Sequence, residues 1–445
     1  MPEIASPPAS TLTPAKTARQ RSDTLTSIWM IIAVAMALVT LVVKNRMPQP
    51  LWTMIHLVTL GVLSNGIFQW SWFFARSLAR LSADDLRARR HNTIRILIFN
   101  ACFLLLFVSM WLGWMVGTMI AATGIAAVAA WHGAEMLSVL RERLASRFVI
   151  VVRYYVCSAS FFVLAALLAS FVSATLFSPS IPEALVAMRD RLTLAHALSG
   201  VAGWVGLTIG GTAITLGPTI LRTRMSPDAV RGGVRVLLPW CLSLLLAIAG
   251  ALLGVMPLVG AGILAVGTCA IVGIVCPYAK VLRNKGPREY SAWSFLLGLL
   301  WISVGVCALG VASLFVSTPS QLRVLTLMWL PIIGIAGFAQ LFQGALSYLM
   351  PVVIGGGPSV VRIGIAIIDW QYSLRLGLRN GALILELFLF FTSESSSVQV
   401  LRTAGWLLVI ATFVIDVVIY AKTGITQAQA RRARSETLSE SRQVQ

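Results

Sequence analysis

Two histidines, His56 and His196, lie inside strongly apolar segments of a chain that has only four histidines among 445 residues. A buried imidazole needs a partner for each ring nitrogen, and its unprotonated nitrogen is a common metal ligand. Ionisable residues inside membrane segments are energetically expensive, so their presence points to a function. Two imidazoles at one depth could share a copper ion or hold a haem from its two sides.

The two histidines are expected at the same depth below one membrane surface. His56 follows the start of its apolar segment, Leu51, by five residues, and His196 follows Leu192 by four. At 1.5 Å of rise per helical residue, each imidazole lies about 6 to 8 Å below that surface. We therefore expect the two rings to meet across a helix bundle and to form the metal or cofactor site.

The segment that carries His196 continues with small residues at helical spacing. Gly203, Gly206 and Gly210 share one helix face with Ser199. Such a face admits either a neighbouring helix at close range or a flat ligand such as a porphyrin ring. In the first interpretation the stripe serves helix packing, and in the second the three glycines contact the cofactor.

The composition determines the fold class. The chain is 58% hydrophobic and 11% charged, and apolar runs of transmembrane length recur along it. Continuous apolar runs indicate helices, because a membrane barrel would alternate with a period of two. The sequence predicts an all-α bundle of about twelve transmembrane helices over residues 27–421, the eleventh spanning Leu376 to Thr392. Residues 1–26 and 422–445 are expected to be disordered cytoplasmic tails.

The basic residues predict the orientation of this bundle. Of the 35 lysines and arginines, twenty-eight fall on one side of the predicted spans, five on the other, and Arg153 and Arg402 within spans. By the positive-inside rule, both termini lie in the cytoplasm, and we expect a bacterial plasma membrane. The net charge of +19 then reflects this asymmetry and contact with the lipid bilayer, and no nucleic-acid partner is expected.

The glycine turn 355–357 lacks the Lys and Ser/Thr of a phosphate loop, so no nucleotide site is expected.

A second polar set lies nearer the cytoplasmic side and comprises His132, Glu135, Arg153, Glu386 and Asp416. Glu135 and Arg153 belong to consecutive antiparallel segments, so an ion pair between them would compensate two charges in the membrane. His132 lies one turn before Glu135, and the three residues would alternatively form a proton or anion path. Glu386 and Asp416 are expected to hydrogen bond to each other's helices with neutral carboxyl groups.

Several motifs of the chain are typical of one group of membrane proteins. They are His56-Leu-Val-Thr-Leu-Gly61, Val152-Arg153-Tyr154-Tyr155-Val156, Ala195-His196, Gly203-Trp204-Val205-Gly206-Leu207-Thr208 and Gly344-Ala345-Leu346-Ser347-Tyr348-Leu349-Met350-Pro351. Over residues 50 to 380 the sequence resembles a family of actinobacterial twelve-span proteins labelled copper oxidase or copper-containing nitrite reductase membrane region. It is more distantly similar to the NnrS proteins, which are haem- and copper-containing membrane proteins linked to nitric oxide metabolism.

The resemblance implies that His56 and His196 bind haem b or copper, and that the protein works with a redox partner in nitric oxide or copper handling. Relatives often carry a second histidine where this chain has Leu198, so fewer ligands remain here. Four histidines cannot supply the binuclear centre of an oxidase. Two other functions stay open: a secondary transporter that uses Glu386, Asp416 and Arg153, and a non-enzymatic accessory or scaffold protein that has lost its ligands.

Overall fold

The computed structural model describes residues 14–82, 84–143, 149–177, 182, 184, 188–284, 286–393 and 395–443. Helices make up nearly all of this part of the chain, and no strand occurs within it. Eleven of the described helical stretches are long and apolar enough to cross a membrane. The protein is therefore an all-α, multi-pass integral membrane protein, as the apolar composition predicted.

The predicted span over Leu376 to Thr392, which is absent from these eleven, corresponds to α17 (Tyr372–Phe390). This helix has 19 residues, but Arg375, Arg379 and Glu386 make it too polar to qualify as a span by composition. All three side chains are buried, so none of these charges faces lipid. The described part of the chain thus has eleven apolar spans and one more polar helix, α17, where the sequence predicted twelve spans.

The chain divides into two compact units, which we describe separately. Unit 1 comprises Met1–Ile214, Gly233–Ile263 and Ser313–Gln321. Unit 2 comprises Thr215–Gly232, Leu264–Ala312 and Leu322–Gln445.

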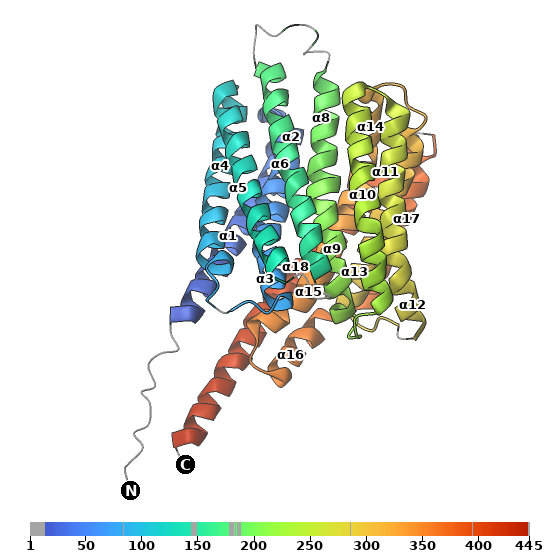
Figure 1. Cartoon of the computed structure of the whole chain (residues 1–445). Coiled ribbons are helices and arrows are strands. Elements are labelled where there is room, and N and C mark those ends of the chain that lie inside the picture. The colour runs from blue at the N-terminus through green and yellow to red at the C-terminus, as the bar shows by residue number, and fades with distance from the viewer. Residues whose placement is uncertain are drawn as a thin grey trace. The chain divides into compact units, whose positions relative to one another are not determined.

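Unit 1 contains the helices of the N-terminal half. These are α1 (Pro14–Val43), α2 (Pro50–His56), η2 (Leu57–Ser64), α3 (Asn65–Leu78), η3 (Arg87–His91), α4 (Asn92–Leu112), α5 (Met115–Glu142), α6 (Val149–Phe177), α8 (Arg189–Ala197), η4 (Leu198–Gly206) and the first part of α9 (Leu207–Ile220), with most of α10 (Pro227–Leu253) and the first half of α11 (Met256–Ala270). Helices α4, α5, α6 and α8 pack side by side (Figure 1). The sequence-based tail of residues 1–26 is helical from Pro14, and residues 1–13 lie outside the described part.

Two glycine turns divide long apolar runs of unit 1 into separate helices. Gly113 ends α4 with a φ of 66°, and Trp114 N donates to Ser109 O at 2.8 Å. Gly254 ends α10 with a φ of 76°, and Val255 N donates to Gly250 O at 2.8 Å. Glycine adopts this left-handed conformation without strain, and the hydrogen bonds satisfy the last carbonyl groups of each helix.

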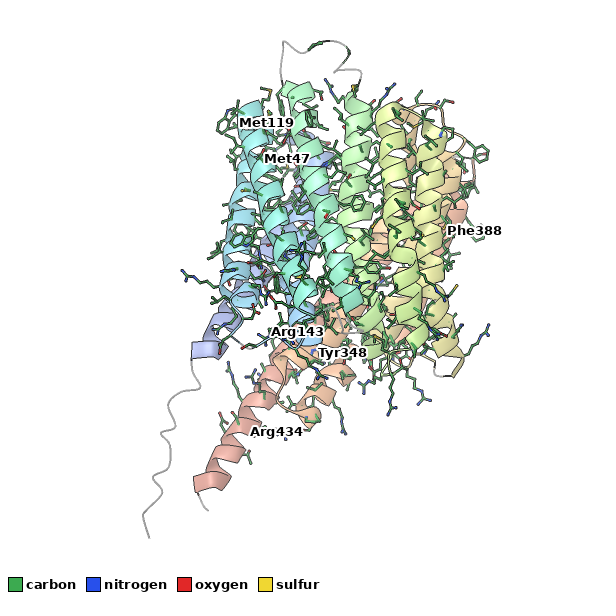
Figure 2. All side chains as sticks on the ribbon, in the orientation of Figure 1. Met47, Met119, Arg143, Tyr348, Phe388 and Arg434 are labelled. Atoms are coloured by element: carbon green, nitrogen blue, oxygen red, sulfur yellow. The ribbon has the colours of Figure 1, made fainter. Side chains whose placement is uncertain are left out.

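Unit 2 contains the helices of the C-terminal half. These are the second half of α11 with η5 (Ile271–Val275), α12 (Cys276–Asn284), α13 (Tyr290–Ser313), most of α14 (Pro319–Pro331), η6 (Ile332–Ala339), α15 (Gln340–Ile354), α16 (Pro358–Ile368), α17 and α18 (Ser396–Gln443). Helix α18 packs against α15, α16 and α17. Its C-terminal part projects beside α16, and Arg434 lies on this projecting part (Figures 1 and 2).

The expectation of a disordered tail over residues 422–445 was wrong, because α18 continues through it to Gln443. Its side chains bind the carbonyl groups at the end of α15 and in the following turn. Gln427 Nε2 donates to Pro351 O at 2.7 Å, Arg431 to Ile354 O at 2.8 Å, and Arg434 to Gly356 O at 2.9 Å. The polar composition suggested disorder, but these contacts and the strong helix formers of the segment favour a helix.

Large apolar side chains cover the outside of the helices in both units. Leu104 and Phe171 are exposed on α4 and α6 of unit 1, and Leu407 is exposed on α18 of unit 2. Phe388 on α17 points away from the helices of unit 2 (Figure 2). Such a surface suits lipid, whereas water-soluble proteins rarely expose large apolar patches.

Candidate functional site

His56 and His196 lie next to each other in unit 1, as the sequence predicted. His56 is the last residue of α2, and His196 is the penultimate residue of α8. Their ring centroids are 6.1 Å apart and their planes differ by 14°. Trp52, one turn earlier on α2, stacks on the other side of His56 with a centroid distance of 4.3 Å. Both imidazoles are partly buried, so the pair lies within the helix bundle without being sealed by it.

A backbone carbonyl group fixes one nitrogen of each imidazole. His56 Nδ1 bonds to Trp52 O at 2.9 Å, and His196 Nδ1 bonds to Ala165 O of α6 at 2.8 Å. Because a carbonyl oxygen only accepts, each Nδ1 carries the proton, and in a neutral ring Nε2 keeps its lone pair. Metal-binding histidines are typically oriented by such a hydrogen bond from the other ring nitrogen.

A segment of π-helix begins directly after His56, and another begins two residues after His196. These segments are η2 after His56 and η4 after Ala197, and a side-chain hydrogen bond joins them, from Trp204 Nε1 to Ser64 Oγ at 2.9 Å. The wider π-helical turns interrupt the regular α-helical ladder, and such segments occur frequently at functional sites. The spans that carry the two histidines therefore share a local geometry.

The glycine stripe of η4 and α9 is occupied by neighbouring side chains. A Cβ atom at Gly203 would lie 2.5 Å from the Cβ of Phe161 on α6. At Gly210 it would lie 3.2 Å from Trp240 of α10 and 3.4 Å from Tyr154 of α6, and at Gly206 it would meet only Val201 O at 3.5 Å. Of the two interpretations of the stripe, this geometry favours helix packing, because the place of a porphyrin is filled by aromatic rings.

The histidine pair offers two protein ligands. No group of three or more His, Cys, Asp or Glu side chains that could hold a metal ion occurs in the described part of the chain. Leu198, two residues after His196, supplies no further ligand. Two imidazoles match the axial positions of a haem or a two-coordinate copper(I) ion, and they are too few for a typical zinc site.

Glu135 forms an ion pair with a different arginine from the one expected. Its carboxylate binds the guanidinium of Arg95 on α4, and it accepts hydrogen bonds from Trp131 at 2.9 Å and from His91 Nδ1 at 2.7 Å. Arg153, the partner that the sequence analysis chose, is exposed on α6. Val152, Tyr154 and Tyr155 face the interior there, which turns Arg153 outward, so the path through His132, Glu135 and Arg153 does not form.

A third polar cluster lies in unit 2, around Asp416 of α18. Its carboxylate binds the guanidinium groups of Arg375 and Arg379 on α17, and the hydroxyl of Tyr290 donates to it at 2.6 Å. Arg379 also donates to Gln343 at 2.8 Å. Asp416 and Arg379 are fully buried.

Asp416 and Glu386 therefore pair with each other's helices, as predicted. Glu386 of α17 lies 3.8 Å from the Nε atom of Arg402 on α18. The sequence analysis did not predict that Arg375 and Arg379 of α17 would both bind the Asp416 carboxyl group. At the end of α16, burial raises the pKa of Asp369, whose carboxylate accepts a hydrogen bond from Tyr290 N at 2.8 Å.

Sequence reasoning missed the residues that complete these clusters, namely His91, Arg95, Trp131, Tyr290 and Gln343. One signal was available: Arg95 begins an apolar run, and Arg375 and Arg379 are one helical turn apart on one face.

Comparisons with known proteins add nothing to this picture. No model of a protein family matches the sequence, and the search of curated proteins finds no match.

Proposed function

We propose that the protein is a membrane metal-binding redox protein whose ligands are His56 and His196, active in nitric oxide or copper handling with a separate redox partner. The observation that carries the proposal is the pair of imidazoles, 6.1 Å apart at their centroids, with each Nδ1 bound to a backbone carbonyl. In both rings Nε2 is the nitrogen that the backbone hydrogen bond leaves available for a metal. The family resemblance described above supports the same assignment.

Copper fits these residues better than haem b does. Imidazole nitrogen suits copper and iron alike, so the donor atoms alone do not choose between them. A porphyrin needs a flat slot beside the ligands, and Phe161, Trp240 and Tyr154 already pack on the glycine face that would provide it. A bound copper ion would supply one-electron redox chemistry, while the chain holds both imidazoles in a fixed tautomer.

The test is copper(I) binding to the purified full-length protein, measured under anaerobic conditions by competition with a chromophoric chelator. We expect one copper ion per chain, and His56→Ala and His196→Ala should each weaken its Kd by more than about 100-fold, since even second-shell partners contribute 10- to 100-fold. His91→Ala is the matched control, because it removes an imidazole that binds Glu135.

A visible spectrum of the same preparation distinguishes the cofactors. A Soret band that is present in the wild type and absent from both His56→Ala and His196→Ala would identify the cofactor as haem b, bound by the same two histidines. Copper binding that is equally strong in the wild type and in both variants, or no binding of either cofactor, would overturn the proposal.

A further inference from the structure

Three nitrogen atoms in unit 1 are buried without a hydrogen-bond partner and belong to neighbouring residues. They are Trp72 Nε1 on α3, Arg95 Nε on α4 and His132 Nδ1 on α5. The relative exposure of these side chains is 1%, 0% and 0%. Buried polar groups in folded proteins nearly always have a partner, so three exceptions in one place require an explanation.

Trp72 is the common neighbour of the other two residues. The guanidinium carbon of Arg95 lies 5.1 Å from the centroid of the Trp72 ring. The imidazole of His132 lies 6.3 Å from the same residue, measured between ring centroids, and is nearly perpendicular to it at 87°. The three residues that carry the unpartnered nitrogens are therefore neighbours and form one cluster, contributed by three helices.

Two of the three unpartnered atoms are obligatory hydrogen-bond donors, because indole Nε1 and guanidinium Nε only donate. His132 Nε2 lies 3.3 Å from Ser71 Oγ. In the tautomer in which Nε2 accepts the Ser71 hydroxyl proton, the ring proton of His132 resides on Nδ1, and the cluster presents three N–H groups.

The rest of the Arg95 guanidinium is already engaged. Nη1 binds Glu135, and Nη2 donates to Arg87 O at 3.1 Å and to Asn92 Oδ1 at 3.4 Å. The free Nε–H group is thus the edge of Arg95 that is directed to neither Glu135 nor the backbone. The guanidinium is held in place with one donor left over.

We propose that Trp72, Arg95 and His132 form an intramembrane binding site for a small monovalent anion. An anion offers several lone pairs to N–H donors, and charged acceptors form the stronger hydrogen bonds. The complete burial of the three side chains restricts the ligand to a small ion. The surrounding sequence favours an anion electrostatically, because residues 84–95 and 131–143 contain six arginines and only four carboxylates.

The competing explanation is that aromatic faces accept these N–H groups. The Arg95 guanidinium lies over the rings of Trp72 and Trp131, and His132 meets Phe68 edge-on. N–H···π contacts are weak compared with hydrogen bonds to oxygen or to an anion. They would satisfy the donors without any ligand, so the two explanations predict different responses to anions.

The test is the thermal unfolding of the full-length protein in a non-ionic detergent, in sodium chloride, sodium nitrate or sodium gluconate at equal ionic strength. Gluconate is too large for the site. We expect the Tm of the wild type to be higher in chloride or nitrate than in gluconate, by roughly 2–4 °C, because a ligand that binds only the folded state stabilises it. Trp72→Phe, which removes one donor and keeps an aromatic ring, should abolish this difference.

Trp240→Phe is the matched control, because Trp240 Nε1 is also buried and unpartnered but lies on α10, outside the cluster. This variant should keep the anion response. If Trp72→Phe does not fold, His132→Gln removes the donor at the Nδ1 position and serves the same purpose. A wild-type Tm that is the same in chloride, nitrate and gluconate would overturn the proposal. An equal difference in Tm between these salts in Trp72→Phe and Trp240→Phe would overturn it as well. The test requires no bound metal, so its outcome is independent of the histidine pair.

Discussion

Two groups of buried polar residues, one in each unit, differ in how completely their members are paired. In unit 2, Asp416, Arg375, Arg379 and Tyr290 leave no buried side-chain nitrogen or oxygen atom without a partner. In unit 1, the histidine pair keeps two imidazole nitrogens outside its hydrogen bonds, and the cluster of Trp72, Arg95 and His132 leaves three nitrogen atoms unpartnered. Both regions are apolar, so the difference lies in the arrangement of the polar groups.

This difference separates a structural network from a binding site. Groups that satisfy one another inside a protein hold helices in a fixed arrangement and have no capacity left for a ligand. Groups that remain unsatisfied raise the energy of the empty protein, and a ligand can recover that energy. The cluster around Asp416 is therefore a stabilising network, and the two clusters of unit 1 are where we propose binding.

Asp416→Asn should produce the largest loss of stability, because it breaks the satisfied network. Asparagine has almost the same shape, but it leaves Arg375 and Arg379 buried without a counter-charge. Removing one partner of a buried ion pair typically destabilises a protein by about 3–5 kcal/mol. The loss would be measured by thermal unfolding in detergent, together with the yield of folded protein from membranes.

Asp228→Asn provides the control within the same unit. Asp228 pairs with Arg231 and Lys280 at the surface, where the side chain of Asp228 is 43% exposed. Exposed ion pairs contribute little, so this variant should unfold close to the wild type. If Asp416→Asn were equally mild, the network would not be the structural element that distinguishes unit 2.

Gly203→Ala tests how the surroundings of the histidine pair are filled. The new methyl group would meet Phe161 at 2.5 Å, and overpacking of this kind costs about 1–3 kcal/mol. Gly206→Ala, on the same stripe, would meet nothing closer than 3.5 Å and should be neutral or slightly stabilising. Unfolding and copper content are measured on both variants. Loss of a haem spectrum in Gly203→Ala without loss of stability would show that a porphyrin, rather than Phe161, occupies this face.

The fold and the meeting of His56 with His196 could be predicted because both follow from counting residues along helices. A fixed rise per residue gives the depth of a side chain from its distance to the start of the span. Counting does not say which neighbouring helix a side chain faces. Glu135 on α5 has α4 on one side and α6 on the other, and it uses Arg95 of α4 instead of Arg153 of α6.

Other features were hidden for different physical reasons. The pairing of Arg375 and Arg379 with Asp416 could not be predicted, because Asp416 lies 41 and 37 residues away in the sequence. The π-helical turns after His56 and His196 have no distinct composition. The unpartnered donors could not be foreseen, because lacking a partner is a property of the packed structure and not of a residue type.

The smallest effect compares one satisfied and one unsatisfied indole in unit 1. Trp204→Phe removes the hydrogen bond to Ser64, while stacking of the ring on Phe162 at 4.6 Å can persist. Trp72→Phe removes the same side-chain volume, but the N–H group that it removes has no hydrogen-bond partner. In gluconate, Trp204→Phe should therefore be the more destabilising of the two by about 0.5–1.5 kcal/mol, the net contribution of one hydrogen bond. In chloride the difference in stability between the two variants should be smaller, because Trp72→Phe then also loses the hydrogen bond from Trp72 to the bound anion. Unfolding curves of the two variants in both salts measure this change, and a difference that is the same in both salts would mean that the two indoles differ only in packing.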